Sequence, residues 1–369
     1  GEPEAAAAAA PPPLGSGGHP RTTVPAPHEI YAVGGQFCDW HGAAGDPADT
    51  VERFSSAAGR WEPLAALISP RARHRVAVLG RDVYVVGGHD GHVELAACER
   101  LKPGARRWEE LAPMATARCS HGLAVLHEAL YATGGSCGSA ARLAECERYD
   151  QEADEWRPLP AMCSPRQGHA SLVLKGCLYA VSGEPPKKGR LAACERLDPA
   201  AGRWSLLPPV AAAWDTLQAT VVAEKLYVVA SLLSRRVAAA CERYDPDTGV
   251  WEALPRNELL HICSAASEAA GRLYVFGKLS HQSNFAVCQS FDPGTGQWEQ
   301  LPPMPTERSS CQAFPAGGRI YVVGSCADAG SGSARVRCAA ERLDPAARRW
   351  EALLAPSRLD CQTAALACA

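Results

Sequence analysis

Short apolar runs separated by turn residues recur along most of this chain. The runs HRVAVLG, HGLAVLH and HASLVLK begin at His74, His121 and His169, and each leads through a polar turn into a second apolar run, such as YVVGG at Tyr84. Runs of this length, rich in Val, Leu and Tyr, are typical of β-strands, and the segments lack the 3.6-residue period of amphipathic helices. The pattern therefore predicts an all-β chain of short strands.

Three markers repeat along the chain about every 47 residues. The first is a tyrosine among apolar residues, at Tyr31, Tyr84, Tyr131, Tyr179, Tyr227, Tyr274 and Tyr321. A tryptophan follows each one, at Trp61, Trp108, Trp156, Trp204, Trp251, Trp298 and Trp350. Between them stand VERF, CERL, CERY, CERL, CERY, CQSF and AERL. Seven sets of these markers predict seven four-stranded blades (strands a to d) arranged as a β-propeller.

The two ends of the repeat region are incomplete in complementary ways. The first unit begins at strand b, from Glu29 to Gly35, whereas the sequence ends in SRLDCQTAALACA, which has the pattern of a strand a. We expect the segment from Cys361 to Cys368 to complete the first blade, because this pairing removes two exposed sheet edges. The propeller is thus predicted over 28–369. Residues 1–27, rich in Ala, Pro and Gly, are predicted to be a disordered low-complexity linker.

Composition narrows the class of protein. The net charge of −3 does not favour a nucleic-acid or membrane partner, and the sequence has no apolar run of the roughly 20 residues that span a bilayer. Five of the 16 cysteines occupy one repeat position (Cys98, Cys146, Cys194, Cys241 and Cys288). Equivalent repeat positions rarely come close enough for a disulfide, so we expect reduced thiols and a cytoplasmic location. Since the chain starts at Gly1, we expect it to be a fragment.

The glycine pair after strand b invites a second interpretation, that of a phosphate-binding loop. A dinucleotide fingerprint requires a strand, a glycine turn and then a helix, and no helix is expected after YVVGG. We therefore assign these glycines to sites where a side chain would crowd the next blade, or where φ is positive. The pair is lost in later units, so blades four to seven are expected to turn differently.

The candidate binding surface is the end of the propeller that carries the b–c and d–a loops. The b–c loops vary in length and chemistry, and variable loops on a rigid scaffold are where recognition usually resides. The d–a loops carry one residue each of a repeated column: Arg71, Arg118, Arg166, Trp214, His261, Arg308 and Arg358. We expect this column and Trp40, in the longest b–c loop, to bind a partner rich in carboxylates or phosphates. The alternative is that each arginine bonds strand-end carbonyls or the Glu of a CER phrase.

These markers together resemble the kelch repeat, and the resemblance extends over residues 28–369. It implies a protein-interaction module, most closely the substrate-recognition domain of a BTB–kelch adaptor for a cullin-RING ubiquitin ligase, with BTB and BACK regions upstream. Related adaptors usually have six blades, which is the alternative to seven. The partner would be a protein or a short, acidic peptide.

Other functions compatible with the resemblance are actin association and, as an enzyme, a copper-dependent propeller oxidase. The oxidase needs exposed His and Tyr ligands, whereas these tyrosines are repeat markers, so we expect no enzyme and no cofactor. A zinc site at His74, His121 and His169 is the remaining metal alternative; packed, hydrogen-bonded histidines explain the same pattern.

Overall fold

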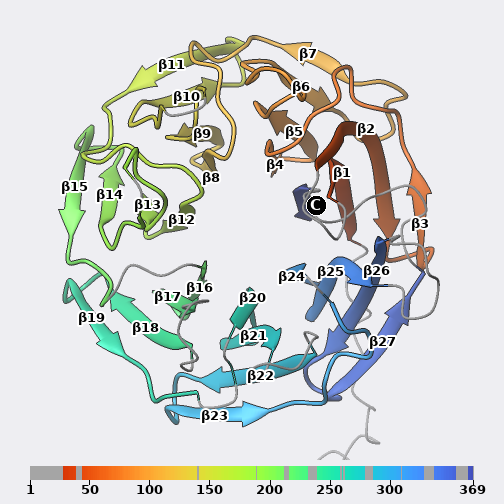
Figure 1. The fold of residues 1–369 in the computed structure, drawn as a ribbon, viewed down its shortest axis with the longest axis vertical. Helices are drawn as coiled ribbons and strands as arrows, with labels where there is room; N and C mark the ends of the chain where they lie inside the picture. Colours follow the sequence, from red (N-terminus) through yellow and green to blue (C-terminus); the bar gives the residue numbers. More distant parts are fainter. Residues whose placement is uncertain are drawn as a thin grey trace, which may run out of the picture.

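The computed structural model describes residues 28–38, 44–138, 141–187, 189–211, 216–231, 239–257, 260, 262–278, 286–308, 310–327, 336–354 and 365–368. The predicted linker at 1–27 lies outside these residues. All regular structure within them is β-strand, in seven four-stranded antiparallel sheets. The prediction of an all-β propeller with seven blades, not six, is confirmed (Figure 1).

Each blade runs from an inner strand a to an outer strand d. Blade 1 contains β28 (Ala365–Cys368), β1 (Glu29–Cys38), β2 (Ala44–Ser55) and β3 (Arg60–Pro63). Blade 2 contains β4 (Arg75–Leu79), β5 (Asp82–Val86), β6 (Cys98–Leu101) and β7 (Glu109–Leu111). Blade 3 contains β8 (Gly122–Leu126), β9 (Ala129–Thr133), β10 (Cys146–Asp150) and β11 (Glu155–Leu159). Blade 4 contains β12 (Ala170–Leu174), β13 (Cys177–Val181), β14 (Cys194–Asp198) and β15 (Arg203–Leu207).

The remaining blades follow the same order. Blade 5 contains β16 (Thr216–Val222), β17 (Lys225–Ser231), β18 (Ala240–Asp245) and β19 (Val250–Ala253). Blade 6 contains β20 (Ile262–Ala269), β21 (Arg272–Lys278), β22 (Val287–Asp292) and β23 (Gln297–Gln300). Blade 7 contains β24 (Ser310–Ala316), β25 (Arg319–Ala327), β26 (Val336–Asp344) and β27 (Arg349–Leu353).

Blade 1 is built from both ends of the described chain. Strand β28 pairs antiparallel with β1, with Ile30 opposite Cys368 and Val33 opposite Ala365. The last strand therefore lies where its sequence pattern places it, as the innermost strand of the first blade. The inner edge of β1 is paired as a result.

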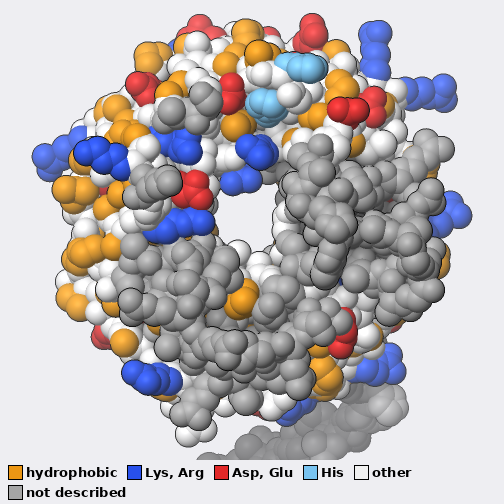
Figure 2. All heavy atoms as spheres, in the orientation of Figure 1, with side chains coloured by type: hydrophobic (Ala, Val, Ile, Leu, Met, Phe, Trp, Pro, Cys, Tyr) orange, Lys and Arg blue, Asp and Glu red, His pale blue; other side chains and the backbone are white. Residues whose placement is uncertain are grey.

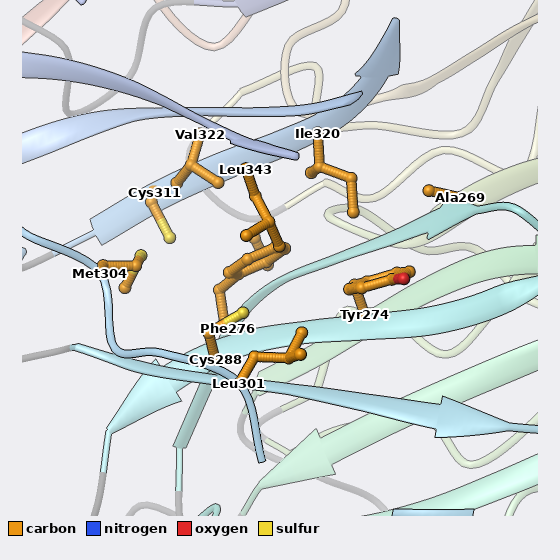
Figure 3. Packing of buried hydrophobic residues seen from close by; sticks show 11 residues of the cluster. Ala269, Tyr274, Phe276, Cys288, Leu301, Met304, Cys311, Ile320, Val322 and Leu343 are labelled. Atoms are coloured by element: carbon orange, nitrogen blue, oxygen red, sulfur yellow. The ribbon is translucent and has the colours of Figure 1, made fainter. Parts of the chain in front are cut away.

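The core lies between neighbouring blades. Between blades 6 and 7, Phe276 and Leu343 are fully buried and pack with Tyr274, Met304 and Val322 (Figure 3). Burial of each such side chain contributes about 1.5–3 kcal/mol. The repeated tryptophans also join blades through hydrogen bonds: the Trp156 Nε1–H donates to Ala112 O at 3.1 Å, and Trp204 Nε1–H to Pro160 O at 3.0 Å.

The glycine pair after strand b has the conformation and crowding expected from the sequence. Gly87 has φ 59°, and a Cβ added there would lie 2.5 Å from Arg118 O of the next blade. Blade 4 keeps this turn, with Ser182 at φ 62° and Gly183 at φ 110°. In blades 5 to 7 strands a and b instead continue their pairing, as far as Thr216 opposite Ser231 in blade 5. The expected change thus begins at blade 5 rather than blade 4.

Candidate functional site

The b–c and d–a loops meet at one end of the propeller, as the strand order requires. Isolated bridges join Ala72 to His89 and Cys119 to Ser136, in each case a d–a loop residue to a b–c loop residue. The same end carries the backbone bond from Gly35 N to Arg71 O, 3.0 Å long. This end, here called the loop face, is the surface on which a site must be sought.

The repeated arginines of the d–a loops are buried beneath this face. Arg71, Arg118 and Arg166 are 0% exposed, and Arg308 is 1% exposed. A guanidinium at these positions is therefore inaccessible to a partner molecule. The other predicted site residues, Trp214, His261, Arg358 and Trp40, lie outside the described residues.

Arg166 illustrates what these arginines do. Its Nη1 donates to Ser182 O and Ala193 O, both at 2.8 Å, and its Nη2 lies 2.5 Å from Glu195 Oε1. Glu195 also accepts the backbone N–H groups of Cys163, at 2.6 Å, and Ser164, at 3.0 Å. The arginine and glutamate together tie the incoming d–a loop to strands b and c of blade 4.

The same bridge recurs in three other blades. Ion pairs join Arg71 to Glu99, Arg118 to Glu147 at 2.6 Å, and Arg308 to Glu341 at 3.0 Å. The prediction that this column binds a partner rich in carboxylates or phosphates therefore does not hold for Arg71, Arg118, Arg166 and Arg308, which are buried and paired within the chain. The alternative interpretation is correct, because a buried guanidinium needs a carboxylate and carbonyl acceptors to offset its desolvation.

A different set of residues lies along part of the mouth of the central channel, just before the innermost strands of blades 2, 3 and 4. Arg73, Ser120 and Gly168 lie two positions after the buried arginines and have positive φ values of 54°, 50° and 60°. Ser120 N donates to Arg73 O at 2.9 Å, and Gly168 N donates to Ser120 O at 2.8 Å. These bonds link three successive d–a loops into an arc, and Arg73 is exposed on it.

Two further arginines lie near this arc. Arg75 begins β4, the innermost strand of blade 2, and its Nε donates to His121 O at 2.8 Å. Arg142, in the b–c loop of blade 3, donates to Ser136 Oγ at 3.4 Å. Within the described residues, Arg73, Arg75 and Arg142 have no carboxylate partner. Lys and Arg side chains gather along the described part of the channel rim (Figure 2).

Acidic groups of the loop face are largely engaged in its own structure. Asp90 accepts the backbone N–H groups of His92 and Val93, both at 2.8 Å, and these bonds lower its pKa. Glu184 pairs with Arg190 at 2.8 Å and accepts a bond from Gln167. Asp90 therefore remains ionised and is held by the backbone of its own loop, whereas the charge of Glu184 is paired within blade 4.

The three histidines of strand a are buried and packed. His74 Nε2 bonds Val33 O at 3.1 Å, and His169 Nε2 bonds Thr133 Oγ1 at 2.9 Å. Burial, reinforced by nearby arginines, lowers the pKa of His74 and of His169 to about 3 and that of His121 well below its usual value. Across the described part of the chain, no three His, Cys, Asp or Glu side chains gather as a metal site would require.

The repeated cysteines are free thiols in the core. Cys98 and Cys146 are buried, and burial raises the pKa of both to about 12. Such thiols are poor nucleophiles because the thiolate is the reactive form. The described residues contain no helix with the length and apolar character needed to cross a bilayer.

Comparison with known proteins agrees with this architecture. The Kelch motif matches residues 70–115, 117–162 and 263–305, which lie in blades 2, 3 and 6. A solved structure described as "Structure of YjhT" is similar in fold, with 13% sequence identity, a TM-score of 0.58, and coverage of 79% of this chain and 99% of that chain. The chain is thus a seven-bladed propeller with Kelch motifs, an architecture consistent with a protein-interaction module.

Proposed function

We propose that this Kelch-motif propeller is the substrate-recognition domain of a BTB–kelch adaptor, and that its loop face binds an acidic segment of a target protein. The adaptor role follows from the resemblance to that family, in which regions outside this chain engage a cullin-RING ligase. The recognition role rests on the loop face itself.

The observation that carries this proposal is the group of three arginines without carboxylate partners, Arg73, Arg75 and Arg142. Arginines on the outer strands differ, because Arg100 pairs with Glu109 at 2.8 Å and Arg342 pairs with Glu351 at 2.8 Å. A carboxylate from a partner would complete the unpaired guanidinium groups. Each charge-assisted hydrogen bond of this kind is worth about 1.5–3 kcal/mol.

The arrangement favours binding over catalysis. All nine tyrosines of the sequence are buried, so the exposed tyrosine ligand of a copper oxidase is not offered by the loop face. The buried thiols and neutral imidazoles likewise serve packing. On this proposal the propeller holds its target and leaves ubiquitin transfer to the ligase.

The test compares partners of the full-length protein in cells by proximity labelling. The variant Arg73→Ala/Arg142→Ala should lose most loop-face partners, at least tenfold in labelling, with an unchanged melting temperature. The matched control is Arg106→Ala/Arg107→Ala, which removes two exposed arginines from a c–d turn at the opposite end. Identical partner sets for wild type and the Arg73/Arg142 variant would contradict the loop face as the recognition surface. Absence of cullin components from the wild-type set would contradict the adaptor role.

A further inference from the structure

Blades 2 and 3 carry opposite charges at the end of the propeller that points away from the loop face. This end, here called the turn face, is formed by the a–b and c–d turns. Blade 2 carries cations at the positions of these turns where blade 3 carries anions. The equivalent positions are Arg81 and Glu128, Lys102 and Asp150, Arg106 and Asp154, and Arg107 and Glu155. All of these residues are exposed except Asp150, which is half-buried.

The c–d turn of blade 2 departs from the turn chemistry of the later blades. In blades 3 to 7 this turn begins with an aspartate that accepts backbone N–H groups, at Asp150, Asp198, Asp245, Asp292 and Asp344. Asp150 Oδ1, for example, accepts from Glu152 N and Ala153 N, both at 3.2 Å. Blade 2 has Lys102 instead, and a backbone bond from Ala105 N to Lys102 O, 3.0 Å long, closes its turn. Because a carboxylate at this position stabilises such turns, turn structure does not account for the lysine.

Several charges of the turn face are available to a partner. The residues that form no ion pair within the described part of the chain are Arg81, Arg106, Arg107 and Glu128. Lys102 pairs with Glu109 at 3.2 Å and Glu155 pairs with Arg157, and all four side chains are at least 40% exposed. Exposed pairs of this kind contribute little to stability, so their charges can exchange with those of a partner.

The positive and negative turns are neighbours held in place by contacts between the two blades. Asp154 Oδ1, in the c–d turn of blade 3, accepts the Ala112 N–H just after strand β7 of blade 2, at 3.0 Å. The same oxygen accepts from Tyr149 Oη at 2.7 Å, and the Tyr149 ring packs edge-on against Tyr84 of blade 2 with centroids 6.1 Å apart. Strands β7 and β11, which follow the two turns, are adjacent on the outside of the ring (Figure 1). The two sets of charges therefore keep a fixed spacing.

This arrangement is complementary to a copy of itself. Equivalent positions of neighbouring blades lie at nearly equal distances from the channel axis. A second copy rotated by half a turn about a radial axis between blades 2 and 3 therefore places its blade 3 against blade 2 of the first, and the reverse. Each cation then faces the anion of its own pair twice, as an isologous interface requires. The next positions outward, Arg60 of blade 1 and Arg203 of blade 4, carry like charges, so the contact is confined to blades 2 and 3.

We propose that the turn face binds a second copy of this chain in a two-fold symmetric dimer, with the turns of blade 2 in each copy against those of blade 3 in the other. A second copy is the occupant because one surface carries both signs of charge at matched positions. Exposed charge pairs are individually weak, so the dimer is reversible and sensitive to salt. The inference goes beyond the proposed function and does not depend on it, since the loop face lies at the other end.

The test measures the oligomeric state of the full chain by sedimentation velocity at increasing protein concentration. Wild type should form a dimer with a dissociation constant between about 1 µM and about 1 mM, the range of weak reversible complexes. Raising NaCl from about 50 to about 500 mM should weaken the dimer at least tenfold, because salt screens exposed charges.

Charge reversal then tests the symmetry of the contact. Arg81→Glu/Arg107→Glu makes both sets of turns acidic, and Glu128→Arg/Glu155→Arg makes both basic, so each variant alone should dimerise at least tenfold more weakly than wild type. An equimolar mixture of the two variants should associate as wild type does, because opposite charges meet again in both directions. The matched control is Arg349→Glu, which reverses the equivalent exposed position of blade 7 and should dimerise as wild type does, whereas Arg107→Glu alone should weaken the dimer.

Three results would overturn the proposal. Wild type could stay monomeric over the whole concentration range, the mixture of the two reversed variants could fail to associate, or both reversed variants could still dimerise. Loss of the dimer only on reversal of Glu128 and Glu155 would place the acidic turns against another cationic surface, such as Arg73 and Arg142 of the loop face, and would equally contradict a two-fold contact. Unchanged melting temperatures of the variants establish that they are folded.

Discussion

Replacement of Arg166 by alanine should destabilise the propeller strongly, even though the residue lies under the predicted binding surface. The change removes three hydrogen bonds to carbonyls and leaves Glu195, which is 0% exposed, without its cation. Removing one partner of a buried ion pair costs about 3–5 kcal/mol, since the remaining charge stays desolvated.

The expected shift in melting temperature follows from the size of the domain. Unfolding entropy is about 2.1 cal/mol/K per residue, or roughly 0.7 kcal/mol/K for the whole propeller. A loss of 3–5 kcal/mol therefore lowers the melting temperature by about 4–7 °C. Urea unfolding followed by tryptophan fluorescence should show the matching decrease in the free energy of unfolding.

Two further variants separate the ion pair from simple loss of packing. Glu195→Ala should also destabilise, and the double variant Arg166→Ala/Glu195→Ala should lose less than the sum of the two, because neither charge is then left alone. Arg73→Ala, an exposed arginine, should change stability by less than about 0.5 kcal/mol. Reasoning from burial fails if Arg166→Ala unfolds within 1 kcal/mol of wild type, or if the two single losses simply add.

Three other predictions test the fold. Gly87→Ala should lower the free energy of unfolding by about 2 kcal/mol more than Gly104→Ala, as measured by urea unfolding. Both glycines have positive φ, but only at Gly87 would an added Cβ lie 2.5 Å from a backbone carbonyl oxygen. Deletion of residues 359–369 removes β28 and should lower the melting temperature of the whole propeller; a truncated protein that melts like the intact one would refute this. Stability should fall below pH 6.5, because histidines of the unfolded chain bind protons there, whereas the buried His74 and His169, with pKa values of about 3, stay neutral in the folded chain. By pH 5 each of the two histidines should lower the free energy of unfolding by about 2 kcal/mol. A flat stability profile between pH 6.5 and 5 would contradict their burial as neutral rings.

The repeat allowed the architecture to be predicted, because each marker has one structural task in every blade. The repeated tyrosines are buried in the core, the tryptophans bond the preceding blade, and the glycine pairs stand where a side chain would crowd the next blade. The same logic explains the error at Arg118 and Arg166. A residue that recurs at a fixed register, together with an equally recurrent glutamate, is more consistent with architecture than with recognition, and the joint change to His261 and Gln289 in one blade was a signal of this pairing.

The exposed candidates were missed for the complementary reason. Arg73, Ser120 and Gly168 share one register but not one chemistry, so no pattern draws attention to them. Only the structure shows that Arg73 and Gly168 are exposed and Ser120 is half-buried, whereas the arginine two positions earlier in each loop is buried. In a repetitive chain, specificity is expected where equivalent exposed positions differ.

The pairing of β28 with β1 has a consequence for biosynthesis. Strand β1 is among the first described segments to leave the ribosome, and its inner partner is the last. At ~5–20 residues per second, translation of the intervening chain takes roughly 15 to 65 s. Throughout that interval the inner edge of the nascent first blade has no partner strand. Chaperones that bind the chain during synthesis should therefore matter more for this protein than for one whose sheets are completed in order.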